Sequence, residues 1–169
     1  ANLTPDSCAR VLAAKAAGAW NLHCLSRDLP LDFFILYSSA TTVLGNPGQG
    51  AYVAANAALE TLAAQRRSLG LPALAVGWGP LSDVGMLARE PAALASLSAL
   101  LGAEALTSDQ ALDALEALHG CAPAQVAVAN LDWSRARRLP AASSPIFGRM
   151  AQGAAADDGE APVFSAEAL

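Results

Sequence analysis

The sequence predicts an α/β fold with a parallel sheet, in which buried strands alternate with helices. Two continuous apolar runs, 33–37 and 73–78, have the length and composition of strands that are covered on both faces. An alanine-rich segment, 51–69, lies between them and is expected to be a long helix. A strand, a helix and a second strand in this order form a right-handed βαβ unit. The two strands are therefore expected to run parallel in one sheet.

Capping and breaking residues place the elements around the first strand. Thr4 and Pro5 begin a helical apolar pattern, which predicts a helix over about residues 5–26. Ser38 and Ser39 then follow the apolar run of the first strand. Several glycines and a proline punctuate the next segment, which is therefore expected to be a loop; they are Gly45, Pro47, Gly48 and Gly50.

The second half of the chain is expected to continue the alternation. Segment 81–101 mixes glycine, proline and short apolar clusters, so we expect short helices on a mobile loop and treat it as a candidate lid. Thr107 caps a predicted helix over 108–119, and 125–130 is a predicted third strand. Residues 135–169 fill with Pro, Ala, Ser, Gly and acidic residues, which is typical of a linker.

Composition and charge argue against several classes of function. The chain has 169 residues, of which 54% are hydrophobic and 15% charged, enough for one globular domain with a buried core. A net charge of -5 leaves no basic surface for nucleic acid or an anionic membrane. The sequence shows no signal peptide and no transmembrane run, so we expect a cytoplasmic protein. Its three cysteines lack CxxC spacing, and we expect no metal site.

Polar side chains are expected to meet at the carboxyl ends of the strands, where ligands bind in parallel α/β sheets. Ser39 ends the first strand, while Tyr52 and Asn56 are four residues apart and share one helix face. Lys15 comes from the one helix able to pack beside them. A phenol has a pKa near ~10, and a nearby ammonium favours its ionised form. The group predicts acid–base chemistry.

Each member of this group is expected to have a separate role. Tyr52 delivers a proton, and Lys15 supplies the field that eases its transfer. Ser39 donates a hydrogen bond to a carbonyl oxygen that becomes negative, and Asn56 orders a water or a backbone group.

At these residues the sequence resembles the ketoreductases of type I modular polyketide synthases, which are relatives of the short-chain dehydrogenases/reductases. The resemblance lies in 34–39 (FILYSS), 48–52 (GQGAY) and 54–57 (AANA). Segments with further similarity are 15–23, 70–73, 78–80 and 131–133. Ordinary short-chain dehydrogenases have a lysine four residues after the tyrosine. Here Asn56 holds that place and lysine lies upstream at Lys15, as in polyketide and animal fatty acid synthase ketoreductases.

The resemblance implies a fold, a cofactor and a partner. The fold is a Rossmann-like, doubly wound parallel sheet, of which 1–134 is the catalytic part and 135–169 leads to an acyl carrier protein. The cofactor is NADPH, and the substrate is a β-ketoacyl chain on the carrier's phosphopantetheine, within a homodimeric megasynthase. The phosphate-binding GxGxxG loop is absent. We therefore expect the nucleotide-binding strands to come from the N-terminal half of the same ketoreductase, and the isolated chain to be inactive.

The resemblance also implies contacts around the four polar residues. Expected cofactor contacts are Lys15, Tyr52, Gly79 and Pro80, and expected substrate or lid contacts are Leu44, Pro47, Gln49 and Met86. One stereochemical class of the family has tryptophan eight residues before the tyrosine. Leu44 stands there instead, which implies a D-configured alcohol. A redox-inactive structural or epimerising domain of a megasynthase stays the alternative function.

Other residues have more ordinary interpretations. His23 is expected to be a packing or capping histidine, and Trp20 and Trp78 are expected in the core. Two interpretations stay open for the basic cluster around Arg135 and Arg137: attraction of an acidic carrier protein, or a solvated surface.

Overall fold

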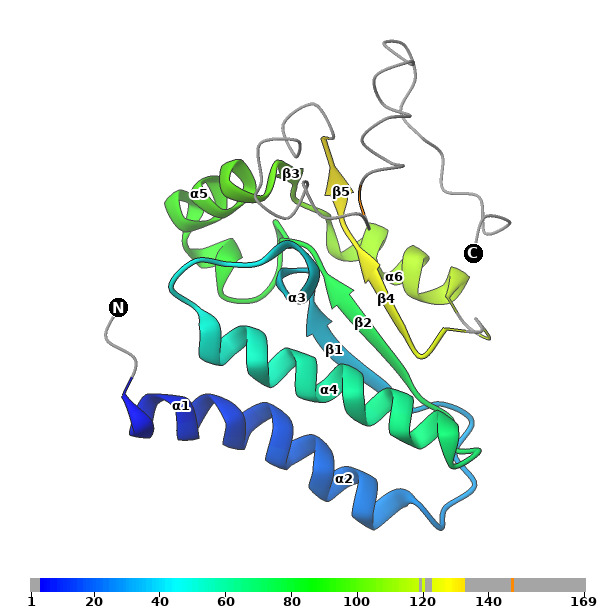
Figure 1. Cartoon of the computed structure of the whole chain (residues 1–169). Coiled ribbons are helices and arrows are strands. Elements are labelled where there is room, and N and C mark those ends of the chain that lie inside the picture. The colour runs from blue at the N-terminus through cyan, green and yellow to red at the C-terminus, as the bar shows by residue number, and fades with distance from the viewer. Residues whose placement is uncertain (1–3, 119, 121–122, 133–146, 148–169) are drawn as a thin grey trace.

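A computed structural model describes residues 4–118, 120, 123–132 and 147, and its centre is a parallel sheet with helices on both faces (Figure 1). The strands β1 (Ile35–Ser39), β2 (Leu74–Trp78) and β4 (Gln125–Val128) are arranged in the order β1-β2-β4. Both pairings are parallel, with Tyr37 opposite Val76 and Val76 opposite Val126. The predicted parallel α/β sheet is confirmed.

Two long helical segments lie side by side on one face of this sheet (Figure 1). The first is continuous over the predicted range but has three parts: α1 (Pro5–Leu12), the π-helical segment η1 (Ala13–Ala17) and α2 (Gly18–Ser26). The side chains of Thr4 and Ser7 form a reciprocal capping box at its start. The second segment is α4 (Gly50–Ser68), which packs on β1 and β2.

Shorter elements surround the carboxyl ends of the strands. A single helical turn, α3 (Thr41–Leu44), follows β1. After β2 come η2 (Leu87–Arg89), α5 (Pro91–Leu101) and α6 (Ser108–Ala117). A two-residue strand, β3 (Ala103–Glu104), pairs antiparallel with β5 (Asn130–Leu131), a pairing that the sequence did not predict.

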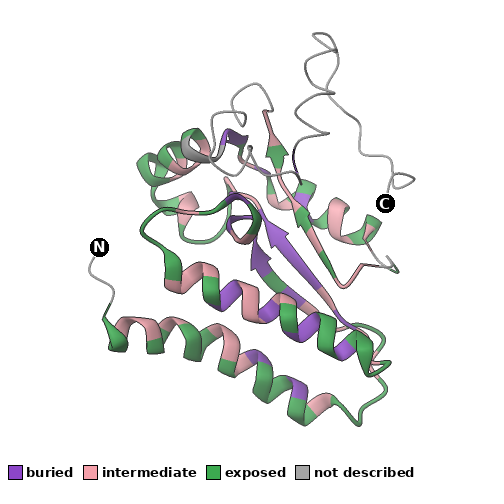
Figure 2. Cartoon of the chain, in the orientation of Figure 1, coloured by how far each residue is buried: buried purple, intermediate pink, exposed green. Residues whose placement is uncertain are grey.

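The sheet buries a different cluster on each face, which makes it doubly wound. On one face Leu36 and Ala75 pack against Leu59 and Leu62 of α4. On the other face, Val76 and Trp78 of β2 pack in a cluster with Ala111 of α6. The purple strands in Figure 2 lie between these helical layers. Alternating side chains of buried strands fill both cores, as expected for a parallel sheet.

Some aromatic positions differ from the prediction. β1 begins at Ile35 rather than at Phe33, which is 60% exposed, and Tyr37 is 53% exposed. β1 is an edge strand of the described sheet; α4 covers its Leu36 face, whereas the described residues leave the Tyr37 side chain on the other face half-exposed. Trp78 is buried as predicted, whereas Trp20 of α2 is 48% exposed, so the core prediction for it was wrong.

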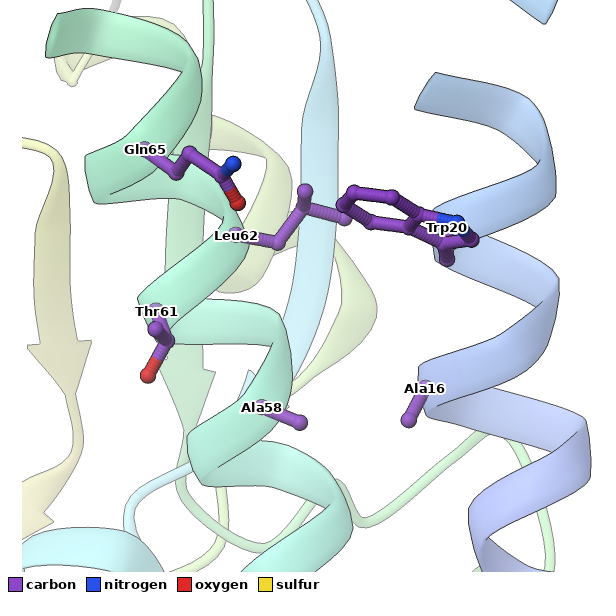
Figure 3. A pocket seen from close by; sticks show the side chains of 6 residues that line it. All are labelled: Ala16, Trp20, Ala58, Thr61, Leu62 and Gln65. Carbon is purple, nitrogen blue, oxygen red and sulfur yellow. The ribbon is translucent and has the colours of Figure 1, made fainter. Parts of the chain in front are cut away.

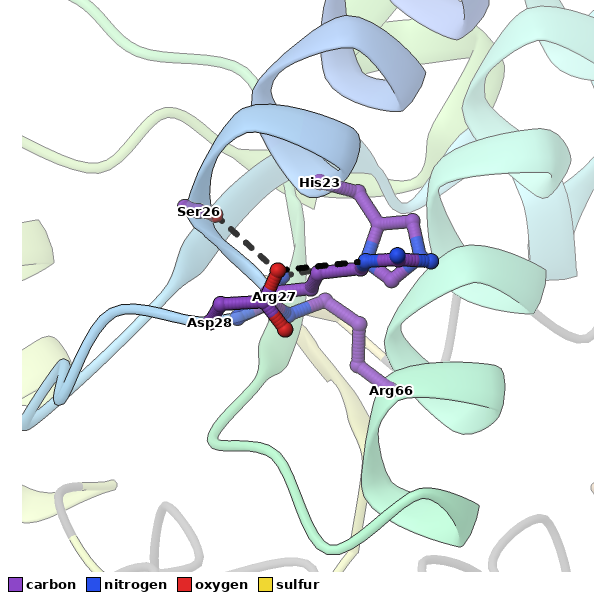
Figure 4. Close-up of polar contacts among 5 residues, drawn as sticks. All are labelled: His23, Ser26, Arg27, Asp28 and Arg66. Carbon is purple, nitrogen blue, oxygen red and sulfur yellow. Dashed lines mark hydrogen bonds and ion pairs between the residues drawn. The ribbon is translucent and has the colours of Figure 1, made fainter.

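A buried arginine joins the two helical segments at the amino ends of the strands (Figure 4). Arg66 of α4 is fully buried; its Nε donates to the carbonyl oxygen of Pro72 at 3.1 Å, and its Nη1 lies 3.1 Å from Nδ1 of His23. Its guanidinium carbon is 3.8 Å from the centroid of the Phe34 ring, an arrangement that favours a cation. Burial lowers the pKa of Arg66. His23 is therefore a buried packing residue, as predicted.

The predicted linker and its arginines lie outside the described residues, with one exception. Phe147 is described, is buried, and packs in a cluster with Ala40, Leu44 and Ala103. Within the described part of the chain, no helix has the length and apolar character needed to cross a bilayer.

Candidate active site

Lys15 lies at the centre of the π-helical segment η1 and points toward the carboxyl half of β1. Its Nζ donates to the carbonyl oxygen of Tyr37 at 2.9 Å and to Oδ1 of Asn56 at 2.6 Å. The same nitrogen lies 5.4 Å from the centroid of the Tyr52 ring. A π-helical turn changes the direction of the residues it contains and is frequent at functional sites. Partial burial lowers the pKa of Lys15.

Asn56 connects the lysine to the tyrosine. Its side chain is fully buried, and its Nδ2 donates to the carbonyl oxygen of Tyr52 one turn earlier at 2.9 Å. Its Oδ1 then accepts from Lys15, so both ends of the amide have a partner. The structure thus brings Lys15, Tyr52 and Asn56 together, as the sequence predicts.

Ser39 is the last residue of β1 and is 7% exposed. Its Oγ accepts from the backbone N–H of Thr41 at 3.3 Å and from Oγ1 of Thr41 at 2.9 Å. Among the described contacts, none joins its hydroxyl to the side chains of Lys15, Tyr52 or Asn56. Ser39 therefore lies at the same end of the sheet as Lys15, Tyr52 and Asn56. Its hydroxyl proton has no acceptor among the described contacts.

A carboxylate that sequence reasoning missed holds the end of β1 against α4. Oε1 of Glu60 accepts from Oγ of Ser38 at 2.6 Å and from Oγ1 of Thr42 at 2.8 Å. The same Thr42 hydroxyl lies 2.9 Å from the carbonyl oxygen of Ser39, so its one proton is shared between the two acceptors. One signal could have found it, because Glu60 lies four residues after Asn56 and so shares its helix face.

Gly77 in β2 lies directly beside the backbone of Ser39. A Cβ atom at this position would meet the carbonyl carbon and oxygen of Ser39, each at 3.3 Å. That separation is tighter than ordinary packing, and the neighbour is backbone, so it could yield only by moving the serine. A glycine inside a strand signals such a close approach, which is how the sequence could have shown it.

The two residues after β2 that are predicted to contact the cofactor, Gly79 and Pro80, already form backbone hydrogen bonds within the protein. Gly79 is half-buried, and its N–H donates to the carbonyl oxygen of Val128 at 2.8 Å. Pro80 is buried, and its carbonyl oxygen accepts from the N–H of Leu106 at 2.9 Å. Both lie at the carboxyl end of β2, close in sequence to its last residue, Trp78.

The predicted substrate contacts have very different surroundings. Leu44 is 9% exposed and packs in the cluster that contains Phe147. Pro47 and Gln49 are exposed in the loop before α4, and Met86 is 79% exposed in the segment after β2. The structure places Leu44 in a core cluster and leaves the other three open to solvent.

The first residues of the candidate lid are held by hydrogen bonds to the segment that precedes α6. Leu81 forms a parallel bridge with Leu106, and the N–H of Ser82 donates to the carbonyl oxygen of Leu106 at 2.9 Å. Asp83 accepts from the N–H of Ser108 at 2.9 Å and from its Oγ at 2.7 Å. These hydrogen bonds lower the pKa of Asp83, and the bond from the Ser108 side chain has the largest effect. Residues 81–83, at the start of the segment 81–101 that is predicted to be a lid, are thus held to the start of α6.

The chemistry of the donors fits one end of a dinucleotide. The Lys15 ammonium has three hydrogens, of which two are used by Tyr37 and Asn56, and the phenol of Tyr52 lies beside it. This pair suits the hydroxyls of a ribose. The sequence has no glycine-rich phosphate loop of the GxGxxG type. Within the described part of the chain, no three His, Cys, Asp or Glu side chains converge as a metal site would require.

A groove of about 390 Å³ lies elsewhere, between α2 and α4 (Figure 3). Its lining residues are Ala16, Trp20, Ala58, Thr61, Leu62 and Gln65. None of the four predicted acid–base residues contributes to it. The groove and the candidate active site are therefore distinct features.

Comparison with known sequences finds one family and a set of synthases. The family model described as the KR domain matches residues 1–83. Polyketide synthase GfsB of Streptomyces halstedii is 43% identical over 86% of this chain and 3% of the synthase. Phthioceranic/hydroxyphthioceranic acid synthase of Mycobacterium tuberculosis is 46% identical over 70% of this chain and 6% of the synthase. The chain thus spans less than a tenth of these curated relatives.

Solved structures give the same family resemblance. The first ketoreductase of the tylosin polyketide synthase is 46% identical, with a TM-score of 0.72 over 80% of this chain and 29% of that one. An A1-type ketoreductase is 35% identical, with a TM-score of 0.81 over 91% of this chain and 33% of that one. The chain spans about a third of each. These likenesses confirm the predicted Rossmann-like α/β fold.

Proposed function

Since this chain belongs to the KR family, the ketoreductases of polyketide synthases, we propose that it forms the catalytic part of an NADPH-dependent β-ketoacyl reductase. The substrate is a β-ketoacyl thioester on the phosphopantetheine of an acyl carrier protein, and the product is the β-hydroxyacyl thioester. One observation carries the proposal: the contact of Lys15 with Asn56 and its position beside the ring of Tyr52. That arrangement is the acid–base group that reduction of a ketone needs.

The chain's own residues handle the charge and the proton of the reaction. NADPH, when bound, supplies the hydride to the ketone carbon. Ser39 donates a hydrogen bond to the ketone oxygen as that oxygen becomes negative. Tyr52 transfers its phenolic proton to the same oxygen, which completes the alcohol.

Lys15 keeps the site prepared for this transfer. Its ammonium favours the phenolate that Tyr52 leaves behind, because opposite charges attract at short range. The carbonyl oxygen of Tyr37 and Oδ1 of Asn56 hold the ammonium in place, and its third hydrogen is available to a ribose hydroxyl. Asn56 is in turn held by the backbone of Tyr52.

The wider setting is part of the same proposal. The N-terminal half of the ketoreductase supplies the phosphate-binding loop, and the domain works in a cytoplasmic, homodimeric megasynthase whose curated relatives are multidomain synthases. Leu44 in place of tryptophan supports a D-configured alcohol. Residues 81–101 act as the lid over the nicotinamide.

The test is turnover by the complete ketoreductase domain that contains this chain. NADPH oxidation is followed with a β-ketoacyl N-acetylcysteamine thioester, and chiral chromatography identifies the alcohol. We expect stoichiometric NADPH consumption and a D-configured product. NADPH binding without oxidation would instead support a redox-inactive domain, and proton exchange at the α-carbon under those conditions would support an epimerase.

A further inference from the structure

The hydroxyl oxygen of Ser39 has two donors, and both belong to Thr41. The backbone N–H of Thr41 donates at 3.3 Å and its Oγ1 at 2.9 Å. A hydroxyl oxygen has two lone pairs and one proton. When Thr41 donates to both lone pairs, the remaining tetrahedral direction is the only one left for the proton of Ser39.

The surroundings keep this arrangement rigid. Ser39 is 7% exposed and Thr41 is 3% exposed, so water has little access to compete for either hydroxyl. The Thr42 hydroxyl lies 2.9 Å from the carbonyl oxygen of Ser39 and 2.8 Å from Oε1 of Glu60 on α4, and its one proton is shared between them. Ser38 donates to the same carboxylate, so the residues on both sides of Ser39 are linked to the helix that carries Tyr52.

We propose that Thr41 is a positioning residue that directs the Ser39 hydroxyl proton toward the ketone oxygen of the substrate. This inference rests on the proposed function, because it assigns the free proton to the hydrogen bond that stabilises the developing alkoxide. A donor oriented before the reaction needs no reorganisation as charge develops. Without the threonine hydroxyl, Ser39 gains a second orientation in which its proton points away from the substrate.

The first experiment measures kcat and KM of the complete ketoreductase domain with Thr41→Val. Valine keeps the branched shape and the backbone N–H but removes the hydroxyl. We expect kcat to fall about tenfold with little change in KM, because the lost interaction strengthens only as charge develops. Thr41→Ser restores a hydroxyl and should restore most of kcat, which a purely packing role would not explain.

A matched control is Thr61→Val on α4. Its hydroxyl donates only to the carbonyl oxygen of Ala57, one turn earlier on the same helix, and the residue is exposed. We expect kcat to stay within about twofold of the unchanged domain. Full kcat in an active domain with Thr41→Val, or failure of Thr41→Ser to recover what valine loses, would overturn the proposal.

A second measurement does not depend on turnover. A double-mutant cycle in urea unfolding combines Ser39→Ala with Thr41→Val. We expect the two losses of stability to be less than additive, because either substitution alone already removes the Oγ1–Oγ hydrogen bond. Additive losses would overturn the Thr41 proposal even in a domain that lacks activity, whereas an inactive domain with coupled losses would contradict only the proposed function.

Discussion

Two polar groups lie between the same pair of helical segments, one at each end of the sheet. Lys15 and Asn56 meet at the carboxyl half of β1, and His23 and Arg66 meet near the residues that precede β1 and β2. Each group has a cation and neutral partners. The exposed ion pair between Arg27 and Asp28 belongs to neither group.

The difference between them is the hydrogen-bonding capacity that each has left for a ligand. Nη2 of Arg66 has no described partner, but the residue is fully buried and no ligand can reach it. Lys15 and Tyr52 are only partly buried, and Lys15 keeps one hydrogen free of described protein acceptors. The Arg66 group therefore joins helices, whereas the Lys15 group can serve a ligand. Accessible hydrogen-bonding capacity at the strand ends, rather than a buried charge as such, marks the candidate active site.

The largest expected effect comes from Tyr52→Phe in the complete domain. The substitution removes the proton donor and keeps the ring, so kcat should fall by about a hundredfold to ten-thousandfold. The midpoint of thermal unfolding should stay within about a degree, because the described hydrogen bond of Tyr52 is made by its backbone. Retention of most of kcat would refute the role assigned to Tyr52.

Lys15→Met should be nearly as severe. Methionine fills a similar volume but loses the ammonium and both donated hydrogen bonds, so we expect kcat to fall about a hundredfold. Lys15→Arg keeps the charge without the compact geometry and should recover only part of the loss. Steady-state kinetics of both variants provide the check, and equal activity of Met and Arg variants would show that charge has no part in it.

Arg66→Met should lower the stability of the fold and leave activity unchanged, which is the reverse of the effect expected for Tyr52→Phe. Loss of the guanidinium leaves His23 and the carbonyl oxygen of Pro72 without their donor, and we expect a loss of about 2 kcal/mol in urea unfolding. Activity per folded molecule should not change. Arg27→Met is the matched control, because Arg27 is exposed and its ion pair with Asp28 contributes little. A fall in kcat with unchanged stability would reverse the distinction between the two groups.

The pH dependence of reduction should reflect the burial of Lys15. The proposed reaction uses the ammonium form of Lys15, and burial lowers the pKa of this group below the ordinary lysine value of 10.5. The rate is therefore expected to fall as pH rises, with the alkaline limb of kcat/KM centred below 10.5. A profile that stays flat through that pH would show that the ammonium is not required.

The smallest effect is expected for Asp83→Ala. Asp83 accepts two hydrogen bonds from Ser108 at the start of α6, so its loss should slightly lower the unfolding midpoint and speed exchange of the Ser108 amide. The pKa of Asp83 is lowered in the folded state, so the stabilisation is present above its ordinary value and disappears as pH falls through the folded value. Hydrogen exchange at neutral and acidic pH measures both effects. Unchanged exchange at Ser108 would show that the contact does not hold residues 81–83 to the start of α6.

Hydrophobic patterns that extend over whole helices and strands predicted most of the fold. The helix from Pro5, the helix ending at Ser68 and the strand at 74–78 lie within one or two residues of their expected bounds. The π-helical turn at 13–17 was not predicted, because an alanine-rich run has the same composition in an α-helix. The pairing of β3 with β5 was also missed, since two-residue strands have no periodicity to detect.

The candidate active site, like the fold, was predicted only in part. Spacing on one helix was enough to associate Tyr52 with Asn56, and the position of Lys15 on the preceding helix added the lysine, which the family resemblance then supported. Thr41 was missed because its contact depends on how the chain turns after β1, which side-chain spacing does not specify. Glu60 was missed although its spacing from Asn56 places both on one helix face. Arg66 resembled an ordinary basic residue at a helix end, and only the packing of Phe34 and His23 around it shows that it is buried.

The contact between Gly77 and Ser39 limits where this protein can be redesigned. A side chain added at Gly77 would press on the backbone of Ser39, so a substitution in this part of β2 would disturb the candidate active site itself. The loop around Gly45 and Gly48 has open space for a Cβ, although both positions have the positive φ that favours glycine. Libraries aimed at new substrates should therefore vary the exposed neighbours Pro47 and Gln49 and keep Gly77 constant.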